Sequence, residues 1–280
     1  KFQMTIDPLF YFEYGKDLAD NSVRASNTKL YRNTRGILLR ANIGDKFSVM
    51  SSLYENQAFF PAYIHNYIKQ SQVAPGEGRV KTFKQNGYDF AIASGYVSFT
   101  PIKRLNFIFG HDKNFIGDGY RSLLLSDNSF NYPFLKITAL WWKGRIQYSA
   151  NYASLQSLNR IPAGDTPEAP FENKAATFHY LSIIPHKRLH IGFFEGIMWQ
   201  RRDSSGSLPF NYNFINPVLG VNTAILGFGK DNNAVMGINL KTKLTNSISL
   251  YGQGMYDKPG RFGFQAGVNY FDVVAIKNLV

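Results

Sequence analysis

The chain is organised by alternation of apolar and polar residues. Between 145 and 152 the even positions are Ile146, Tyr148, Ala150 and Tyr152, and the odd positions are Arg145, Gln147, Ser149 and Asn151. The same alternation runs over 37–42, 236–241 and 262–270, and less cleanly over 88–100 and 175–184. A period of two sends successive side chains to opposite faces of a sheet. The pattern predicts an all-β protein, with one short helix over Ala62–Ile68 after Pro61.

The connections between the predicted strands alternate in length. Short turns fall at Gly44–Lys46, Pro101–Arg104, Lys143-Gly144, Pro185–Arg188 and Thr245-Asn246, and long polar loops at 16–32, 58–87, 112–133, 155–174 and 201–233. Outer-membrane β-barrels have this asymmetry, with tight turns on one side and long loops on the other, and strands of about ten residues. The fold class predicted is therefore a transmembrane antiparallel outer-membrane β-barrel with about 12 or more visible strands.

Other features agree with a barrel in a membrane. No apolar run approaches the roughly 18 residues that a membrane-spanning helix needs. The wet face carries polar and charged residues that suit a water-filled lumen better than a soluble core. Aromatic residues near the predicted strand ends fit an interfacial girdle, although aromatics also favour strands in general: Trp141, Trp142, Tyr152, Trp199, Tyr256 and Tyr270.

We expect residues 1–280 to form one barrel domain that is incomplete at its C-terminal end, because Ile276–Val280 resembles the start of a further strand. The visible strands would then be a segment of a larger barrel. Lys1 has no signal-like segment around it, so we interpret it as a processed or trimmed start.

The charge and composition of the chain restrict the classes of partner that it is expected to bind. The net charge is +12, with 31 Lys and Arg against 19 Asp and Glu, and there is no cysteine. A basic protein suits anionic matter. Without a nucleic-acid motif, the predicted partners are outer-membrane lipid and lipopolysaccharide, acidic capsular polysaccharide and other outer-membrane proteins, with no nucleic acid. Basic residues predicted on the wet face would make the lumen positive, although the turn lysines and arginines carry part of the excess: Arg40, Arg145, Lys241 and Lys243.

The densest polar cluster lies between Gly110 and Asn128. It cannot be a calcium loop, because Ile116 and Leu123 occupy positions that would need ligand oxygens. One interpretation is a loop folded into the barrel, tied down by Arg121 and Lys113 pairing with Asp112, Asp118 or Asp127; the other is a ligand site, and both can hold together. The candidate ligand-binding residues are His111, Lys113, Asn114, Asp118, Tyr120, Arg121, Asp127, Asn128, Arg201 and Arg202.

Enzyme chemistry has little support. The chain has no Gly-x-Ser-x-Gly elbow, and a pairing of His111 with Ser122 is of the kind that arises by chance. His186 and His190 lack the further ligands of a zinc site. We predict no catalytic residues, no metal and no cofactor.

Several segments resemble the capsule-assembly Wzi-like, or gliding-motility RemB-like, barrels of Bacteroidetes. They are Gly110–Asn128, Tyr54–Gln57, Pro75-Gly76, Trp199–Asp203, Asn216-Pro217 and Asp231–Ala234. The resemblance covers most of the chain and implies an outer-membrane barrel, in Wzi itself a surface lectin that holds capsule. The chain departs from the family in the short link Asp257–Gly260 and in ending before family members do.

The sequence therefore predicts a non-enzymatic outer-membrane barrel whose extracellular loops bind surface polysaccharide or partner proteins, in capsule attachment, gliding motility or envelope assembly. Sugar rings would stack on Tyr63, Tyr67, Tyr120 and Tyr212, and acidic groups would pair with the loop arginines. The alternatives are a structural subunit of a larger outer-membrane machine and a passive anion-preferring channel.

Overall fold

The fold is known from a computed structural model that describes residues 1–18, 20–21, 24, 29–160, 171–203, 206–228, 232–258 and 260–272. Within this part of the chain, a 13-stranded antiparallel sheet contains almost all of the regular structure. Its main path runs through β1 (Phe2–Gly15), β2 (Leu30–Ile43), β3 (Phe47–Phe59), β7 (Gly87–Ile102), β8 (Leu105–Asp112), β9 (Tyr132–Trp141), β10 (Ile146–Arg160), β11 (Phe171–His186), β12 (Leu189–Gln200), β15 (Asn232–Lys243), β16 (Ile248–Lys258) and β17 (Arg261–Tyr270).

The smaller elements lie in the connections. β6 (Lys81–Phe83) pairs with β7, and two short hairpins are formed by β4 (Val73–Ala74) with β5 (Gly78–Arg79) and by β13 (Arg202–Asp203) with β14 (Gly206–Ser207). The helices are α2 (Ala62–Ser71), α3 (Val221–Leu226) and the 3₁₀ turns η1 (Trp142–Gly144) and η2 (Tyr212–Ile215). None of the described helices is both long and apolar enough to cross a membrane.

The predicted all-β fold and its meander order are confirmed. Each strand on the main path pairs with the next such strand along the chain, and all the predicted short turns join paired strands. The predicted helix is also found, although α2 continues to Ser71. The loop predicted over 155–174 is wrong in extent, because β10 runs to Arg160 and β11 begins at Phe171. The strand start expected at Ile276–Val280 lies outside the described residues.

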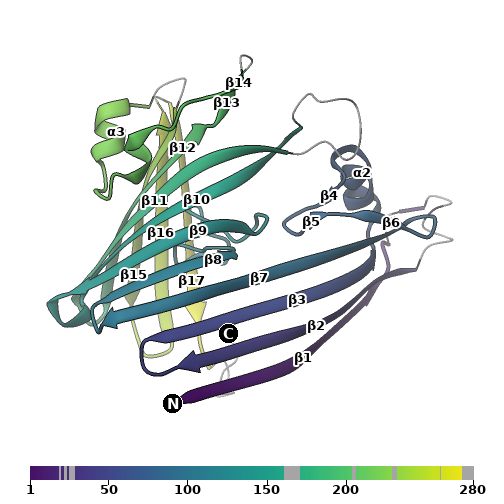
Figure 1. Ribbon diagram of the computed structural model, residues 1–280, viewed down its shortest axis with the longest axis horizontal. Coiled ribbons are helices and arrows are strands. Elements are labelled where there is room, and N and C mark those ends of the chain that lie inside the picture. The colour runs from purple at the N-terminus through teal and green to yellow at the C-terminus, as the bar shows by residue number, and fades with distance from the viewer. Residues whose placement is uncertain are drawn as a thin grey trace.

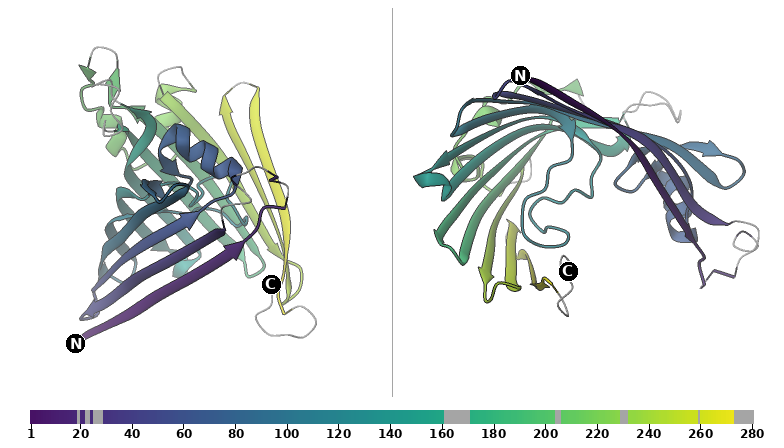
Figure 2. Two further views of the ribbon diagram at one scale, coloured as in Figure 1. Left: turned by 90° about the vertical axis from the view of Figure 1, so that its right-hand side faces the viewer. Right: turned by 90° about the horizontal axis from the view of Figure 1, so that it is seen from below.

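The sheet curves into an arc, and Figure 2 shows it from below with β1 and β17 at the two ends. Among the described residues, β1 pairs only with β2 and β17 only with β16. In Figure 1 the short turns lie at one end of the strands, while α2, β4 and β5 lie toward the other, which we call the long-loop end. The curvature gives the sheet a concave inner face and a convex outer face.

The outer face is apolar. The register places Phe264 and Val268 of β17, Ile238 and Leu240 of β15, and Phe10 of β1 on this face. These side chains are exposed, Phe264 by 81% and Phe10 by 79%. The pattern reverses that of a soluble sheet, in which the residues facing outward would be polar. Towards the long-loop end the same face becomes polar, at Arg35, Glu55 and Gln57.

The inner face is largely polar. Asn239, Gln253 and Gln265 are register partners on β15, β16 and β17, and Lys136 lies opposite Asn151 on β9 and β10. Apolar side chains also point inward, among them Phe178, Tyr180 and Phe194, which are buried. The polar face that the alternation predicted is interrupted by these apolar residues at β11 and β12, where a segment of the chain packs against the wall.

Candidate functional site

The segment that packs against the inner wall is the inner loop, residues 113–131, which joins β8 to β9. Figure 2 shows it on the concave side of the arc. An isolated bridge between Ile116 and Leu125 closes its central part. Ile116 and Leu124 are buried in one cluster with Phe178 and Phe194. The apolar residues of the inner wall thus hold the inner loop inside the arc, in agreement with the prediction of a loop folded into the barrel.

The polar anchor of the inner loop is Asp118. Its Oδ1 accepts a hydrogen bond from Lys241 Nζ at 2.8 Å, and its Oδ2 accepts one from Asn239 Nδ2 at 2.7 Å. His190 Nδ1 lies 3.2 Å from Oδ2 and donates to it, since a carboxylate only accepts. Burial alone would raise the pKa of Asp118, but the hydrogen bonds from His190, Lys241 and Asn239 outweigh it and hold the pKa well below its usual value. Asp118 is therefore ionised and fixed to the wall.

A second contact fixes the loop backbone beside Asp118. Gln253 Oε1 accepts a hydrogen bond from the backbone N–H of Leu123 at 2.9 Å, and its Nε2 donates to Asn239 Oδ1 at 3.0 Å. Gly117 has φ of +133°, and a Cβ there would lie 2.0 Å from Gln253 Nε2 and 2.3 Å from Ser122 Oγ. Only glycine fits this backbone conformation and this close approach.

The predicted partners of the loop charges are wrong. Lys113 Nζ donates to the backbone O of Gly76 at 2.6 Å, and the Arg121 guanidinium lies over the ring of its neighbour Tyr120, so neither charged side chain pairs with Asp112, Asp118 or Asp127 in the part of the chain that is described. Asp118 instead pairs with Lys241 and His190, which are more than 70 residues away in the sequence. Lys241 could be placed on the inner face by alternation, but nothing local in the sequence connects it to Asp118.

The structure does not bring the ten candidate ligand-binding residues together. His111 lies on the outer face, with Nδ1 3.3 Å from the backbone O of Ala93. Asn114 is buried, while Tyr120, Arg121, Asp127 and Asn128 are exposed. Arg201 is exposed at the end of β12, and the side chain of Arg202 lies outside the described residues. Their role in ligand binding stays a prediction.

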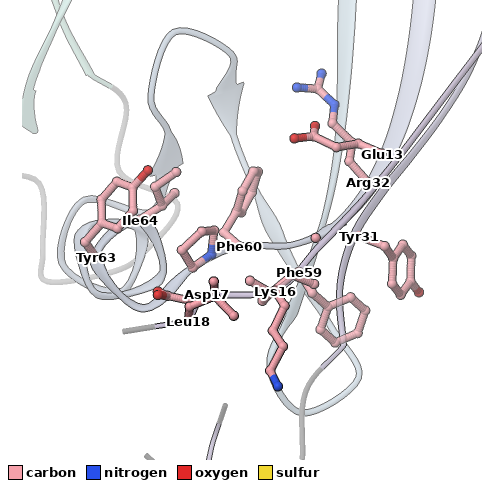
Figure 3. Close-up of a pocket in the computed structure, with 13 residues that line it drawn as sticks. Glu13, Lys16, Asp17, Leu18, Tyr31, Arg32, Phe59, Phe60, Tyr63 and Ile64 are labelled. Carbon is pink, nitrogen blue, oxygen red and sulfur yellow. The ribbon is translucent and has the colours of Figure 1, made fainter. Parts of the chain in front are cut away.

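A pocket of about 720 Å³, the rim pocket, lies at the long-loop end of β1, β2 and β3. Figure 3 shows its mixture of aromatic and charged side chains. The rings of Tyr31 and Phe59 pack with centroids 4.9 Å apart, and Tyr63 and Phe60 approach from the α2 side. The charged lining residues are Glu13, Lys16, Asp17 and Arg32. Arg32 is fixed by Glu77 Oε1 at 3.0 Å and Asn56 Oδ1 at 2.8 Å.

On the opposite, convex face, residues 208–228 fold back over the wall as an outer flap that includes η2 and α3. In Figure 1, α3 lies next to β12. Glu195 of β12 is fully buried beneath it, and accepts hydrogen bonds from the backbone N–H of Gly220 at 2.8 Å and of Thr223 at 3.0 Å. Thr177 Oγ1 donates to the backbone O of Phe214 at 2.8 Å. The flap covers polar side chains on an otherwise apolar face, which explains why β11 and β12 alternate poorly.

Comparisons with known proteins place the chain only distantly. No protein-family model matches it, and no curated protein sequence does. Among solved structures it is similar to the NanC porin in a rhombohedral crystal form, with 9% identity and a TM-score of 0.40 over 85% of this chain and 93% of that chain. The resemblance to the capsule-assembly family stays a prediction, and function has to be argued from the residues of the chain itself.

Proposed function

We propose that this protein is a non-enzymatic outer-membrane β-barrel that forms a passive, anion-preferring channel narrowed by the inner loop. The observation that carries the proposal is the reversal of polarity across the sheet, with exposed Phe264, Val268 and Phe10 outside and Asn239, Gln253 and Lys136 inside. In water, exposing such a large apolar face would promote aggregation, whereas lipid solvates it.

The membrane also sets a requirement on the sheet edges. Backbone groups left unpaired in lipid cost several kcal/mol each, so spanning sheets are closed. The edges of β1 and β17 would therefore have to be paired in the membrane, with each other or with further strands. Cross-linking between single cysteines placed on β1 and β17 tests direct pairing.

The anion preference follows from the charges on the inner face. Lys136 and Lys243 point inward, and neither forms an ion pair within the described residues. Asp118 is neutralised locally by Lys241, whose Nζ lies 2.8 Å from its Oδ1, so it adds little negative potential beside the inner loop. A wall lined by uncompensated ammonium groups raises the local concentration of anions.

Conductance across a planar bilayer tests this channel. We expect the reversal potential in a salt gradient to indicate a preference for chloride over cations. We expect Lys136→Gln to reduce this preference. Lys103→Gln removes the same charge from the β7–β8 turn and is the matched control, expected to change nothing. Absence of current from inserted protein, or cation preference, would contradict the proposal.

A second candidate function, glycan binding, is favoured by the rim pocket. Aromatic faces beside fixed charged groups suit sugar rings with acidic substituents. We expect Tyr31→Ala and Tyr63→Ala to weaken binding of acidic polysaccharide by roughly tenfold, the effect of losing an aromatic contact worth about 1.5 kcal/mol. Tyr270→Ala, at an exposed ring on β17 outside the pocket, is the control. Glycan-array signals that do not respond to the pocket variants would exclude this site, and with it a capsule-holding role for the rim.

A further inference from the structure

We propose that a groove on the outer face, between the wall and the outer flap, binds one acyl chain of an anionic membrane lipid, with Arg201 holding the lipid phosphate. The proposal rests on the membrane location proposed above and adds a specific ligand to it. The groove has a volume of about 1170 Å³.

The groove is apolar on both sides. Phe109, Leu135 and Ile137 of β8 and β9 line it from the wall, and Phe210 and Phe214 line it from the flap. The wall residues occupy register positions on the outer face, continuous with the exposed apolar residues of the rest of the sheet. The groove therefore opens on the side that faces lipid, where a hydrocarbon chain is the most abundant apolar molecule.

The flap itself has the polarity expected in lipid. Polar groups of the flap are paired with the wall or with each other: Thr223 Oγ1 donates to Glu195 Oε1 at 2.5 Å, and Asn216 Nδ2 donates to Asn222 Oδ1 at 3.0 Å. Its outward side presents exposed apolar residues: Phe210, Tyr212, Ile215, Val218 and Ile225. A surface loop in water would show the opposite distribution. The flap thus extends the lipid-facing surface around the groove instead of closing the groove against water.

Two groups at the end of β12 select an anionic headgroup. Arg201 is the only charged residue among those that line the groove, and in the described part of the chain its guanidinium has no hydrogen-bond or ion-pair partner. Trp199 is 5% exposed and lines the same groove, and its Nε1–H has no hydrogen-bond acceptor there. A guanidinium pairs well with a phosphate, and a buried indole N–H needs an acceptor such as a phosphate or ester oxygen.

Trp199 also provides the test. The chain has three tryptophans, so Trp141→Phe with Trp142→Phe leaves Trp199 as the sole emitter. The detergent-solubilised protein is titrated with a phosphatidylglycerol brominated in its acyl chains, which quenches nearby tryptophan. We expect saturable quenching at about one lipid per protein, and much weaker quenching by the uncharged diacylglycerol with the same brominated chains.

Variants distinguish a specific lipid-binding site from the general solvation of the outer face by lipid. In the same background, Arg201→Gln is expected to weaken binding about tenfold, as the loss of one charged hydrogen bond predicts. Arg188→Gln, which removes an equal charge from the opposite turn, is expected to have no effect. Ser154→Leu fills the groove from the wall and is expected to abolish saturable quenching. Native mass spectrometry provides an independent check, because this variant should lose the co-purified lipid.

Quenching that rises without saturation, or that is equal in all variants, would overturn the proposal. Cross-linked dimers in which a second copy of this protein occupies the groove would also overturn it. The failure of the groove and of the membrane proposal are distinguishable. Protein that inserts into vesicles but binds no lipid saturably refutes only the groove, whereas protein that stays soluble without detergent refutes both.

Discussion

The anchor of the inner loop allows a quantitative prediction. Asp118 and Lys241 are 2.8 Å apart, with side chains 15% and 31% exposed. We consider Asp118→Asn, Lys241→Met and the double variant. Each single change leaves the partner in a partly buried site without its counter-charge.

The magnitude lies between two known limits. Exposed ion pairs contribute about 0–1 kcal/mol, and breaking a fully buried pair costs about 3–5 kcal/mol. A pair of intermediate exposure should cost about 2 kcal/mol per single variant. Because the double variant leaves no unpaired charge between these two residues, the single effects should fail to add by about 1–2 kcal/mol.

Urea unfolding of the protein in lipid vesicles, followed by tryptophan fluorescence, measures the free energy of unfolding of all four proteins. Circular dichroism should show the same strand content in each, since the wall strands do not depend on the loop. A coupling below about 0.5 kcal/mol, the size expected for independent residues, would refute the claim that this pair fixes the inner loop.

Three further predictions concern the loop and the flap. The pKa of Asp118 is depressed in the folded protein, so the ionised carboxylate should stabilise the fold fully above the unfolded pKa of about 3.9. This stabilisation should be lost as the pH falls below that value. Chemical denaturation should show the loss in the parent protein and not in Asp118→Asn. Gly117→Ala should destabilise by at least about 1 kcal/mol by urea unfolding, while Gly15→Ala, where a Cβ meets nothing within 4 Å, should have no such effect. Glu195→Gln replaces an acceptor oxygen by a donor that faces backbone N–H groups, so hydrogen exchange across residues 208–228 should accelerate. Equal exchange rates in Glu195→Gln and the parent would show that this carboxylate does not hold the flap.

The sequence predicted the strands and turns well because a period of two and a tight turn are local properties. The alternation over 262–270 appears directly in β17, and the Lys143-Gly144 turn joins β9 to β10. The same local character explains the correct prediction of α2, which follows Pro61.

The site was less predictable because its contacts join distant parts of the chain. Asp118 and Lys241 are separated by 123 residues, and the choice of partner depends on how the inner loop enters the arc. The flap is a similar case. The polar residues Thr177 and Glu195 occupy outer positions and point to the place that the flap covers. In the sequence alone, however, they only weaken the alternation of a strand and do not indicate that another segment covers them.

The central claim is that the convex face of the sheet meets lipid and the concave face meets water. The chain has no cysteine, so single cysteines at 264, 265, 268 and 269 can each carry a spin label in vesicle-inserted protein. The account predicts that labels replacing Phe264 and Val268 collide mainly with dissolved oxygen, and those replacing Gln265 and Asn269 mainly with a water-soluble nickel chelate. Equal accessibility at all four positions, or the reverse order, would contradict it.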